Sequence, residues 1–366
     1  MSRIAVAMSG GVDSAVAAGL LVREGHEVVG LTMNLWPDWL PEPDDAFKAC
    51  CGVSAIDDAR AVARHLGIRH YVLNMREEFE REVIGYFVDE YARGRTPNPC
   101  IACNQSIKFS LLLRKVRALG LDALATGHYA RIASDPATGR WGLWRGRDRH
   151  KDQSYVLYGL TQVQLQMVRL PVGEFDKTQI RATAHRMELP VADKPDSQEI
   201  CFVPRGTYAD VVQRLRPQAV RPGPILDTSG RVVGTHQGIT RFTIGQRRGL
   251  GVAAGVPQYV VGIDPARNAV ILGHEEDLLC DGLTAGGMNW IAITTLDGPM
   301  SVTARLRHAS RDVDATVTPA GPAGDVTVRF ATPQRAAAPG QAIVFYNGDI
   351  VIGGGTIAGI HTRVHA

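Results

Sequence analysis

Residues 4–14 (IAVAMSGGVDS) constrain the fold of this chain more than any other stretch. Residues 4–8 form an unbroken apolar run, which is typical of a strand buried on both faces of a sheet. Gly10 and Gly11 allow a tight turn and a close approach of the backbone to a ligand. Ser14 then opens an apolar helix. A helix that starts after a glycine turn presents free N–H groups, so the pattern predicts a phosphate-binding loop.

This loop is not a Walker A loop, because no Gly-Lys-Ser/Thr sequence follows it. Residues 9–14 (SGGVDS) instead resemble the pyrophosphate loop of the ATP pyrophosphatases. Enzymes of that group activate a carbonyl oxygen by adenylation and release pyrophosphate. An ordinary strand-to-helix turn is the weaker alternative, because the whole Ser-Gly-Gly-x-Asp-Ser pattern directly follows a strand.

The composition is that of a globular protein with more than one domain. A length of 366 residues predicts two or three domains, and a net charge of +3 predicts no nucleic-acid partner unless basic residues cluster. No apolar run is long enough to span a bilayer, and the N-terminus lacks a signal-peptide pattern, so we expect a cytoplasmic protein. Its six cysteines are then expected to be reduced, catalytic or metal-binding rather than structural disulfides.

Strand and helix patterns alternate in the first part of the chain. Strands are predicted at residues 27–34, 70–75 and 122–126, and helices at 55–66, 77–91 and 104–119, with loop composition at 35–51. The alternation predicts an α/β domain with a doubly wound parallel sheet, which binds ligands at the carboxyl ends of its strands. The loop at 9–14, the region near Met33, and Gly127 with His128 fall at those ends.

The amino-acid composition changes after about residue 206, where glycine and proline become frequent. Short strands are predicted at residues 259–263, 269–272, 302–307, 325–330, 342–346 and 350–352. We therefore expect a catalytic domain at 1–205, a small, mostly β central domain at 206–280 and a C-terminal β-barrel at 281–366.

The cysteines carry the second chemical signal. Cys100 and Cys103 are predicted in a loop just before a helix that begins at Asn104, where a thiol is reactive, and Cys201 lies in a distant turn-rich segment. Two alternatives are a redox pair formed by Cys100 and Cys103, and a zinc site formed by both of these with Cys50 and Cys51. The sixth cysteine, at position 280, is predicted to be a buried apolar residue.

Six motifs together resemble the tRNA-specific 2-thiouridylases, members of the ATP-pyrophosphatase (PP-loop) superfamily. They are residues 95–109 (RTPNPCIACNQSIKF), 125–131 (ATGHYAR), 151–154 (KDQS), 196–202 (DSQEICF), 242–249 (FTIGQRRG) and 339–341 (PGQ). With the loop that begins at residue 7, they follow the family's order and cover essentially the whole chain.

The resemblance implies a role for each matching residue. ATP would be held by Ala7, Met8, Ser9, Gly10, Gly11, Val12, Asp13, Ser14, Met33 and Gly127, with Asp13 also catalytic. Cys103 would be the nucleophile, Cys201 would carry sulfur as a persulfide, and His128 and Gln341 match positions that matter for activity. The target base would face Asn98, Pro99 and Cys100, where some relatives have Asp in place of Cys100. Contacts to tRNA would come from Lys151, Asp152, Gln153, Arg305 and Leu306.

The implied reaction is ATP-dependent thiolation of the wobble uridine in a tRNA anticodon loop. Adenylation of the C2 carbonyl oxygen, with Mg²⁺ beside the triphosphate, creates a good leaving group, and persulfide sulfur replaces the oxygen. Attack of Cys103 on the persulfide leaves a disulfide with Cys201 that thiols must reopen. The expected partners are tRNA and a cysteine desulfurase or relay protein as sulfur donor, and the enzyme is expected to be a monomer.

Two other functions fit parts of the sequence. Another ATP pyrophosphatase, such as an amidotransferase-type synthetase or a tRNA-lysidine-type ligase, would not need cysteines at both 103 and 201. A non-catalytic RNA- or metal-binding protein would use the barrel and the cysteines. Arg241, Arg247 and Arg248 are candidate phosphate contacts, with a solvated charged surface as the alternative.

Overall fold

The computed structural model describes residues 1–40, 53–136, 138–196, 200–203, 208–252, 256–308, 310–321 and 324–362. Cys50, Cys51 and most of the loop predicted at 35–51 lie outside these residues. The structure divides into two compact units. The first comprises Met1–Ile84, Pro99–Pro204 and Asp349–Val351, and the second comprises Gly85–Asn98, Arg205–Gly348 and Ile352–Ala366.

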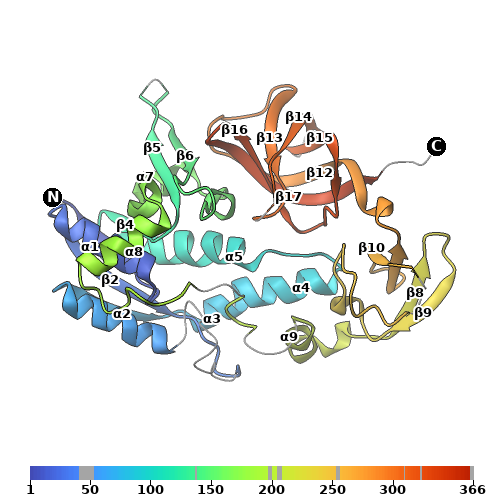
Figure 1. The fold of residues 1–366 in the computed structure, drawn as a ribbon, viewed down its shortest axis with the longest axis horizontal. Coiled ribbons are helices and arrows are strands. Elements are labelled where there is room, and N and C mark those ends of the chain that lie inside the picture. Colours follow the sequence, from blue (N-terminus) through green and yellow to red (C-terminus); the bar gives the residue numbers. More distant parts are fainter. Residues whose placement is uncertain are drawn as a thin grey trace. The chain divides into compact units, whose positions relative to one another are not determined.

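A parallel sheet of five strands, in the order β3-β2-β1-β4-β7, forms the centre of the first unit (Figure 1). The strands are β1 (Arg3–Ala7), β2 (Glu27–Asn34), β3 (Arg69–Asn74), β4 (Ala123–Ala125) and β7 (Val168–Arg169). The inner strands β1 and β2 are buried at consecutive positions. In the edge strand β3, by contrast, each residue is either exposed or half-buried. This difference confirms that the apolar run at the N-terminus is a central strand covered on both faces. The short edge strand β7 was not predicted.

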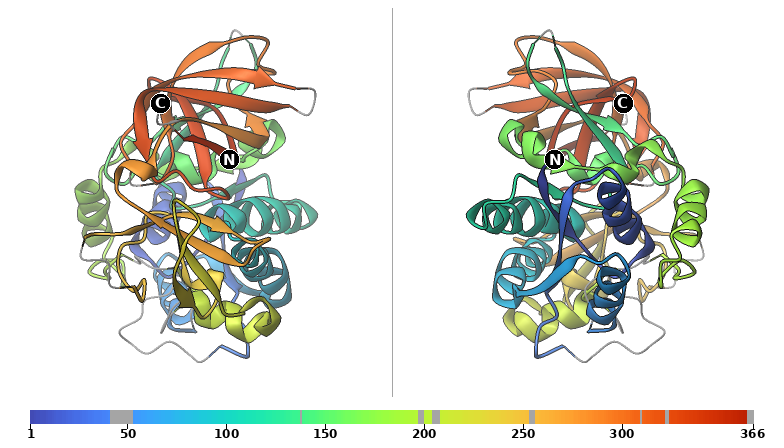
Figure 2. Two further views of the ribbon diagram at one scale, coloured as in Figure 1. Left: turned by 90° about the vertical axis from the view of Figure 1, so that its right-hand side faces the viewer. Right: turned by 90° about the vertical axis from the view of Figure 1, so that its left-hand side faces the viewer.

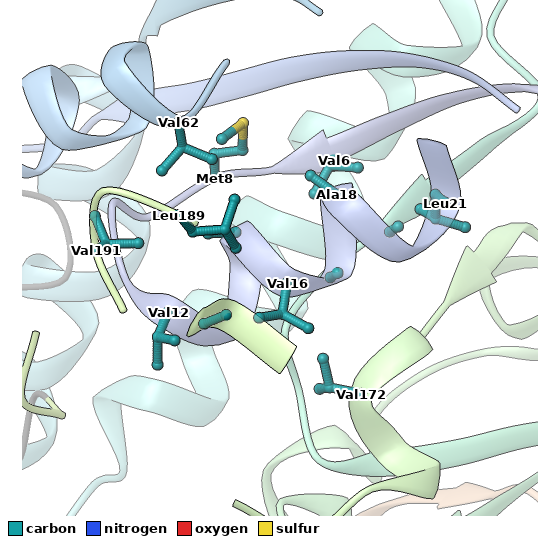
Figure 3. Close-up of a cluster of buried hydrophobic side chains, with 14 of the residues drawn as sticks. Val6, Met8, Val12, Val16, Ala18, Leu21, Val62, Val172, Leu189 and Val191 are labelled. Carbon is teal, nitrogen blue, oxygen red and sulfur yellow. The ribbon is translucent and has the colours of Figure 1, made fainter. Parts of the chain in front are cut away.

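Helices cover both faces of this sheet. Figure 2 (right) shows α1 (Val12–Arg23) and α2 (Val53–His65) on one side of the strands and the helix that includes α6 (Leu113–Ala118) on the other. Small side chains such as Ala15 and Ala18 let α1 lie close to β1, and both are almost fully buried. Figure 3 shows that α1 fills a single hydrophobic core with residues from β1, α2 and the later loops. The doubly wound prediction is confirmed.

Two long helical segments contain π-helical stretches. One runs through α3 (Arg76–Phe79), η1 (Glu80–Gly85) and α4 (Tyr86–Ala92), and the other through α5 (Pro99–Ala102), η2 (Cys103–Leu112) and α6. Both segments are helical as predicted. However, the second helix begins at Pro99 rather than at Asn104, so the predicted loop position of Cys100 and Cys103 is wrong. Proline is well suited to a first helical position because its missing N–H has no partner there.

The remainder of the first unit combines a hairpin with short helices. The antiparallel strands β5 (Ala130–Ser134) and β6 (Trp141–Arg145) were not predicted. The mostly helical stretch after residue 153 is confirmed, although β7 interrupts it; it contains η3 (Ser154–Leu157), α7 (Gln162–Met167), η4 (Pro171–Glu174) and α8 (Lys177–Arg186). Capping boxes at Thr161 and Asp176 fix where α7 and α8 begin.

The central part of the second unit is a small mixed sheet with the strand order β10-β11-β8-β9. It comprises β8 (Gly223–Asp227), β9 (Val232–His236), β10 (Tyr259–Asp264) and β11 (Ala269–Gly273), with the short helices η5 (Pro217–Ala219) and η6 (Ile239–Arg241). The strands predicted at 259–263 and 269–272 are confirmed. The helix α9 (Tyr208–Leu215) was not predicted, because a segment of eight residues is too short to show the helical repeat of apolar residues clearly.

The C-terminal part of the second unit is a closed barrel, coloured orange to red in Figure 2. Its strands are β12 (Leu279–Trp290), β13 (Met300–Arg305), β14 (Val313–Ala320), β15 (Asp325–Arg335), β16 (Ala342–Asn347) and β17 (Ile350–Thr362), preceded by η7 (Glu276–Leu278). The order β12-β15-β14-β13-β16-β17, with β17 paired back to β12, closes the ring and confirms the predicted barrel. Cys280 is buried as predicted: burial raises the pKa of its thiol to about 11.

Candidate active site

The candidate site lies where the order of the parallel sheet reverses. Strand β1 lies between β2 and β4, so the chain leaves β1 toward one edge and returns at β4 on the other side. The loop after β1 and residues 126–128 after β4 meet there: a Cβ atom on Gly127 would lie only 2.6 Å from the Ser14 amide nitrogen. Crevices of this kind bind ligands in open α/β sheets.

The loop at residues 9–14 has the geometry of a phosphate cradle. Gly10 adopts a φ of +65°, and a Cβ atom there would lie 2.3 Å from the Ala55 carbonyl oxygen, so only glycine fits. The Ser14 hydroxyl accepts from the Ser9 amide at 3.2 Å and donates to the Gly11 carbonyl at 3.1 Å. The N-cap residue of α1, Gly11, has no side chain with which to cap the helix. The first N–H groups of α1 therefore suit an anionic ligand.

Asp13 is held by two residues that the sequence did not single out. Its Oδ1 atom accepts from the Tyr129 hydroxyl at 2.6 Å and from the Lys177 ammonium at 2.7 Å. Burial, together with the neighbouring Asp13 charge, raises the pKa of Tyr129. The phenol therefore stays protonated and donates, and the carboxylate of Asp13 is fixed in one orientation.

A second carboxylate, Asp196, gathers three cations. It accepts from Lys151 and Lys177 at 2.8 Å each and from Arg181 at 3.2 Å. Burial alone would raise the pKa of Asp196, but the hydrogen bonds from Lys151 and Lys177 outweigh it and lower the pKa below its ordinary value. Lys151, a predicted tRNA contact, therefore lies in this ionic cluster.

Lys194 completes the charged surroundings of the loop. Its ammonium donates to the Gly10 carbonyl at 3.1 Å and pairs with Asp58 of α2. The cluster then contains the cations Lys151, Lys177, Arg181 and Lys194 and the carboxylates Asp13, Asp58 and Asp196. Asp148, which accepts from the backbone amides of Lys151 and Lys177, also lies in this cluster. The four cations beside the cradle are therefore paired with carboxylates, and a polyphosphate could replace those carboxylates as their partner.

His128 and Met33 are buried next to this crevice. Burial, with Lys108 nearby, holds the pKa of His128 well below its ordinary value, and its Nδ1 lies 2.7 Å from the Thr126 hydroxyl. His128 is therefore a neutral hydrogen-bonding group at pH 7 rather than a fixed cation. Met33 lies near the end of β2, two residues beyond Leu31, whose carbonyl accepts from the Met8 amide at 2.8 Å.

Asp152 and Gln153 form hydrogen bonds with neighbouring residues of the same unit. The buried Asp152 carboxylate accepts from the amides of Gly146 and Ser154 at 3.0 and 3.1 Å and lies 3.7 Å from the guanidinium of Arg145. Gln153 pairs with the backbone of Tyr129 through two bonds of 2.8 and 3.0 Å. Both residues thus hold the chain around Tyr129, and their predicted contact with tRNA stays a prediction.

We expect Asp152→Ala to destabilise the fold by about 3 kcal/mol, because it strips buried amides and a buried guanidinium of their carboxylate. The measurement is urea unfolding followed by circular dichroism. Asp312→Ala is the matched control, since its partly exposed carboxylate pairs with Arg305 on the barrel and should cost less than about 1 kcal/mol. Equal losses for the two variants would contradict a buried anchoring role for Asp152.

The three candidate reactive cysteines all belong to the first unit. Cys100 is the second residue of α5 and is exposed, whereas Cys103 is the first residue of η2 and is half-buried. Cys201 is also half-buried and lies in a turn beside Phe202. The ring of Phe202 packs against the ring of Phe79, with 6.0 Å between the ring centroids. That aromatic contact anchors the chain immediately after Cys201.

The remaining predicted residues belong to the second unit. Gln341 donates to the Thr96 carbonyl at 3.1 Å, and so holds the chain two residues before Asn98. Arg305 pairs with Asp312 at 2.8 Å, and Leu306 is buried. The Leu306 side chain is thus a core residue, and any contact with tRNA at this position would fall to its backbone.

The described residues contain no cluster of three or more His, Cys, Asp or Glu side chains that could hold a metal ion. Nor does any helix in the described part of the chain have the length and apolarity to cross a membrane.

Family models match the chain in three consecutive segments. They are the tRNA methyl transferase HUP domain at residues 2–205, the tRNA methyl transferase PRC-barrel domain at 209–274 and the aminomethyltransferase beta-barrel domain at 280–357. A tRNA-specific 2-thiouridylase MnmA from Moorella thermoacetica is 53% identical, and the match covers 97% of this chain and 99% of the relative.

The chain belongs to the tRNA-specific 2-thiouridylase family. A second member, from Acetivibrio thermocellus, is 49% identical over the same shares of both chains. Among solved structures, a 4-thiouridine synthetase–RNA complex with bound ATP covers 60% of this chain and 51% of its own, with a TM-score of 0.36 and 18% identity. That likeness is too distant to carry a conclusion. Lys177, Arg181 and Lys194 were missed as site residues, because separated single residues give no motif before the fold brings them together. Tyr129 lies inside the motif at residues 125–131, but nothing in that motif gave it a role.

Proposed function

We propose that this protein is an ATP-dependent tRNA-uridine 2-sulfurtransferase. It converts the wobble uridine of tRNA to 2-thiouridine, with AMP and pyrophosphate as the other products. Membership of the thiouridylase family supports the overall reaction. The observation that carries the mechanism is the juxtaposition of the glycine cradle at 9–14 with Gly127, together with the contacts of Lys177 and Lys194 to residues of that cradle.

The residues of the crevice fit the triphosphate of ATP. Gly10 and Gly127 let the loop pack directly against Ala55 and let the chain after β4 approach residues 13 and 14. The first N–H groups of α1, which begins after Gly11, can then bind phosphate oxygens. Lys177 and Lys194 supply positive charge at the loop, through their contacts with Asp13 and with the Gly10 carbonyl. The bound nucleotide supplies an electrophilic α-phosphorus to the uridine C2 oxygen, and pyrophosphate leaves.

Mg²⁺ is the proposed counter-ion of the phosphates. Magnesium usually takes one or two carboxylates together with phosphate oxygens and water, so it does not require a protein cage. Asp13 is the candidate carboxylate, since it lies in the loop itself and the Tyr129 and Lys177 bonds hold only its Oδ1 atom in place.

Sulfur transfer then uses the two half-buried cysteines of the first unit. A donor protein, a cysteine desulfurase or a relay protein, leaves a persulfide on Cys201. The Cys103 thiolate attacks the inner sulfur of that persulfide, which forms a Cys103–Cys201 disulfide and releases hydrosulfide. Hydrosulfide attacks C2 of the adenylated uridine, AMP leaves with the former C2 oxygen, and a proton is lost. Two equivalents of thiol reduce the disulfide before the next turnover.

We assign recognition of the target base to Asn98, Pro99 and Cys100. A wobble base can leave the stack of an anticodon loop and be read individually, as proteins commonly do with single-stranded RNA. Lys151 and Arg305 are candidate phosphate contacts, and both would have to exchange a carboxylate partner for the RNA. A monomeric, cytoplasmic enzyme remains our expectation.

The function is tested by nucleoside analysis of substrate tRNA after incubation with the protein, ATP, Mg²⁺ and a sulfide source. We expect 2-thiouridine to appear only with ATP. Asp13→Asn keeps the size of the side chain but removes the charge that holds Lys177, so thiolation should fall roughly ten- to hundredfold. Glu24→Gln, at the exposed end of α1, is the control and should match the wild type. Thiolation that needs no ATP, or a fully active Asp13→Asn, would contradict the assignment.

A further inference from the structure

In the second unit, a short segment of chain leads from the helix α4 to Asn98, which we assigned to the target base. The helix ends in a Schellman motif, in which Gly94 has a φ of +69°. The Gly94 amide donates to the Tyr91 carbonyl at 3.0 Å. The Arg95 amide donates to the Glu90 carbonyl at 2.9 Å. The chain therefore leaves the helix in one fixed direction.

The Glu90 carboxylate holds the same turn through its two oxygen atoms. Its side chain is only 8% exposed. Oε1 accepts from the guanidinium of Arg93 at 3.1 Å, and Oε2 lies 2.8 Å from the Nε atom of Arg95. Both the backbone and the side chain of Arg95 therefore return to Glu90, and loss of the carboxylate would release one of these two attachments.

The next residue, Thr96, is held by the turn that precedes β16. Its amide donates to the Pro339 carbonyl at 2.8 Å, and its carbonyl accepts from the Gln341 side chain at 3.1 Å. A Cβ atom on Gly340 would lie 3.0 Å from the Thr96 nitrogen, so the turn passes directly against the segment. Ile357 of β17 bonds to the backbone of Gly340 and Gln341 at 2.9 and 2.8 Å, which fixes the turn to the barrel.

Two prolines restrict the chain between Thr96 and Asn98. Pro97 and Pro99 each have a fixed φ and confine the residue before them to extended conformations. Those preceding residues are Thr96 and Asn98 themselves. Two residues span at most about 7 Å, so a fixed Thr96 limits Asn98 to a small volume. The segment is therefore ordered before RNA binds, which reduces the entropy lost on binding.

We propose that Glu90 and Gln341 are positioning residues for the recognition of the target base. They fix the two residues that precede Pro97, and through them the position of Asn98. The inference rests on the proposed function, which takes Asn98 as a contact of the target base. Gln341 acts on the base through the protein chain, and Glu90, which lies outside every motif, has the same role.

The clamp made by Glu90 and Gln341 contributes to specificity rather than to general affinity for RNA. Contacts to phosphates give affinity for any tRNA, whereas contacts to the base give the preference for uridine. Hydrogen bonds to a base weaken steeply when the contacting group is misplaced. A loosened segment should therefore weaken the binding of tRNA with a wobble uridine and leave tRNA with another base at that position almost unaffected.

The test compares the dissociation constants of one tRNA that carries either uridine or cytidine at the wobble position. In the wild type we expect a preference for uridine of roughly tenfold or more, because well-placed bonds to a base discriminate by this much. Glu90→Gln and Gln341→Met should each reduce the preference to about threefold or less, through weaker binding of the uridine tRNA. The affinity for a non-hydrolysable ATP analogue should not change.

The chain offers a matched control for each variant. Asp89→Asn makes the same change of charge as Glu90→Gln one residue earlier in α4, but its half-exposed carboxylate pairs with Arg216 at 3.3 Å. Gln334→Met is the control for Gln341→Met, because the Gln334 amide donates to neighbouring residues of its own strand, β15. Both controls should keep the wild-type preference for uridine.

The outcomes separate this inference from the function on which it rests. A wild type that forms no 2-thiouridine would overturn both. If the wild type thiolates tRNA, an unchanged preference for uridine in the two variants would overturn the inference alone. An equal loss of affinity for both tRNAs, or a wild type that prefers neither base, would do the same. Thermal unfolding checks that each variant folds; if Glu90→Gln does not, the half-buried Gln341→Met decides.

Discussion

Cys201→Ser should form no detectable 2-thiouridine and yet still release pyrophosphate in a single turnover with tRNA. Serine cannot carry a sulfur atom as a persulfide, so the transfer step has no carrier. Adenylation depends on the phosphate loop and on cations such as Lys177 and Lys194, which this substitution leaves in place. We therefore expect the first-turnover release of pyrophosphate to stay within about threefold of the wild type, because no phosphate contact is lost.

Two measurements on the same samples test this expectation: pyrophosphate by a coupled assay and thiolated nucleoside by mass spectrometry. Cys280→Ser is the matched control, because Cys280 is buried in the barrel, where its Sγ donates to the Gln334 carbonyl at 3.3 Å, a bond that serine can keep. It should thiolate tRNA normally. A persulfide trapped on another cysteine, with Cys201 unmodified, would refute the assignment of the sulfur carrier.

The sequence was most informative where function depends on short-range pattern. The strand, glycine turn and helix of residues 4–23 could be predicted because an apolar run, Gly10 and Gly11 each act within a few residues. Regularly spaced strands were enough to predict a barrel. They were not enough to predict its strand order, in which β12 pairs with both β15 and β17. That order depends on contacts between strands far apart in the chain.

The charged cluster around the loop could not have been predicted from sequence alone. Lys177 follows the capping residue Asp176 and looks like an ordinary surface lysine at a helix start. Lys177 and Asp13 are 164 positions apart in the sequence, and only the fold brings them into contact. Asp152 shows the opposite case: it belongs to a motif expected at the tRNA surface, and the structure buries it beside Arg145. A motif identifies residues that matter without saying whether they touch the substrate or support those that do.

The start of the second long helix changes the argument about the two neighbouring cysteines. With the helix beginning at Pro99, Cys100 lies in its first turn and Cys103 one turn further along. The helix dipole, whose effect fades beyond the first turn, therefore favours a thiolate at Cys100 rather than at Cys103. Helix electrostatics alone would choose the wrong residue if the family's nucleophile is at 103.

Packing gives a physical reason to choose Cys103. The Asn104 amide, itself buried, donates to the Val156 carbonyl at 3.0 Å, and Ile107 and Phe109 are fully buried. These residues fix the helix directly after Cys103, so its half-buried sulfur is held in one place, whereas Cys100 is exposed. A transfer step between two sulfurs needs such a fixed position more than it needs a small gain in thiolate fraction.

We therefore expect Cys103→Ser to abolish 2-thiouridine formation and the reductant-sensitive bridge to Cys201. Cys100→Ser should keep at least about a tenth of the activity, because it loses a contact to the base rather than a bond-forming sulfur. The test assays thiolated tRNA for both variants and maps disulfides by mass spectrometry without reductant. An inactive Cys100→Ser beside an active Cys103→Ser would reverse the assignment and show that helix electrostatics, not packing, selects the nucleophile. A Cys100–Cys103 bridge in the wild type would instead support the redox-pair alternative, because residues three apart on a helix lie on neighbouring positions of one face.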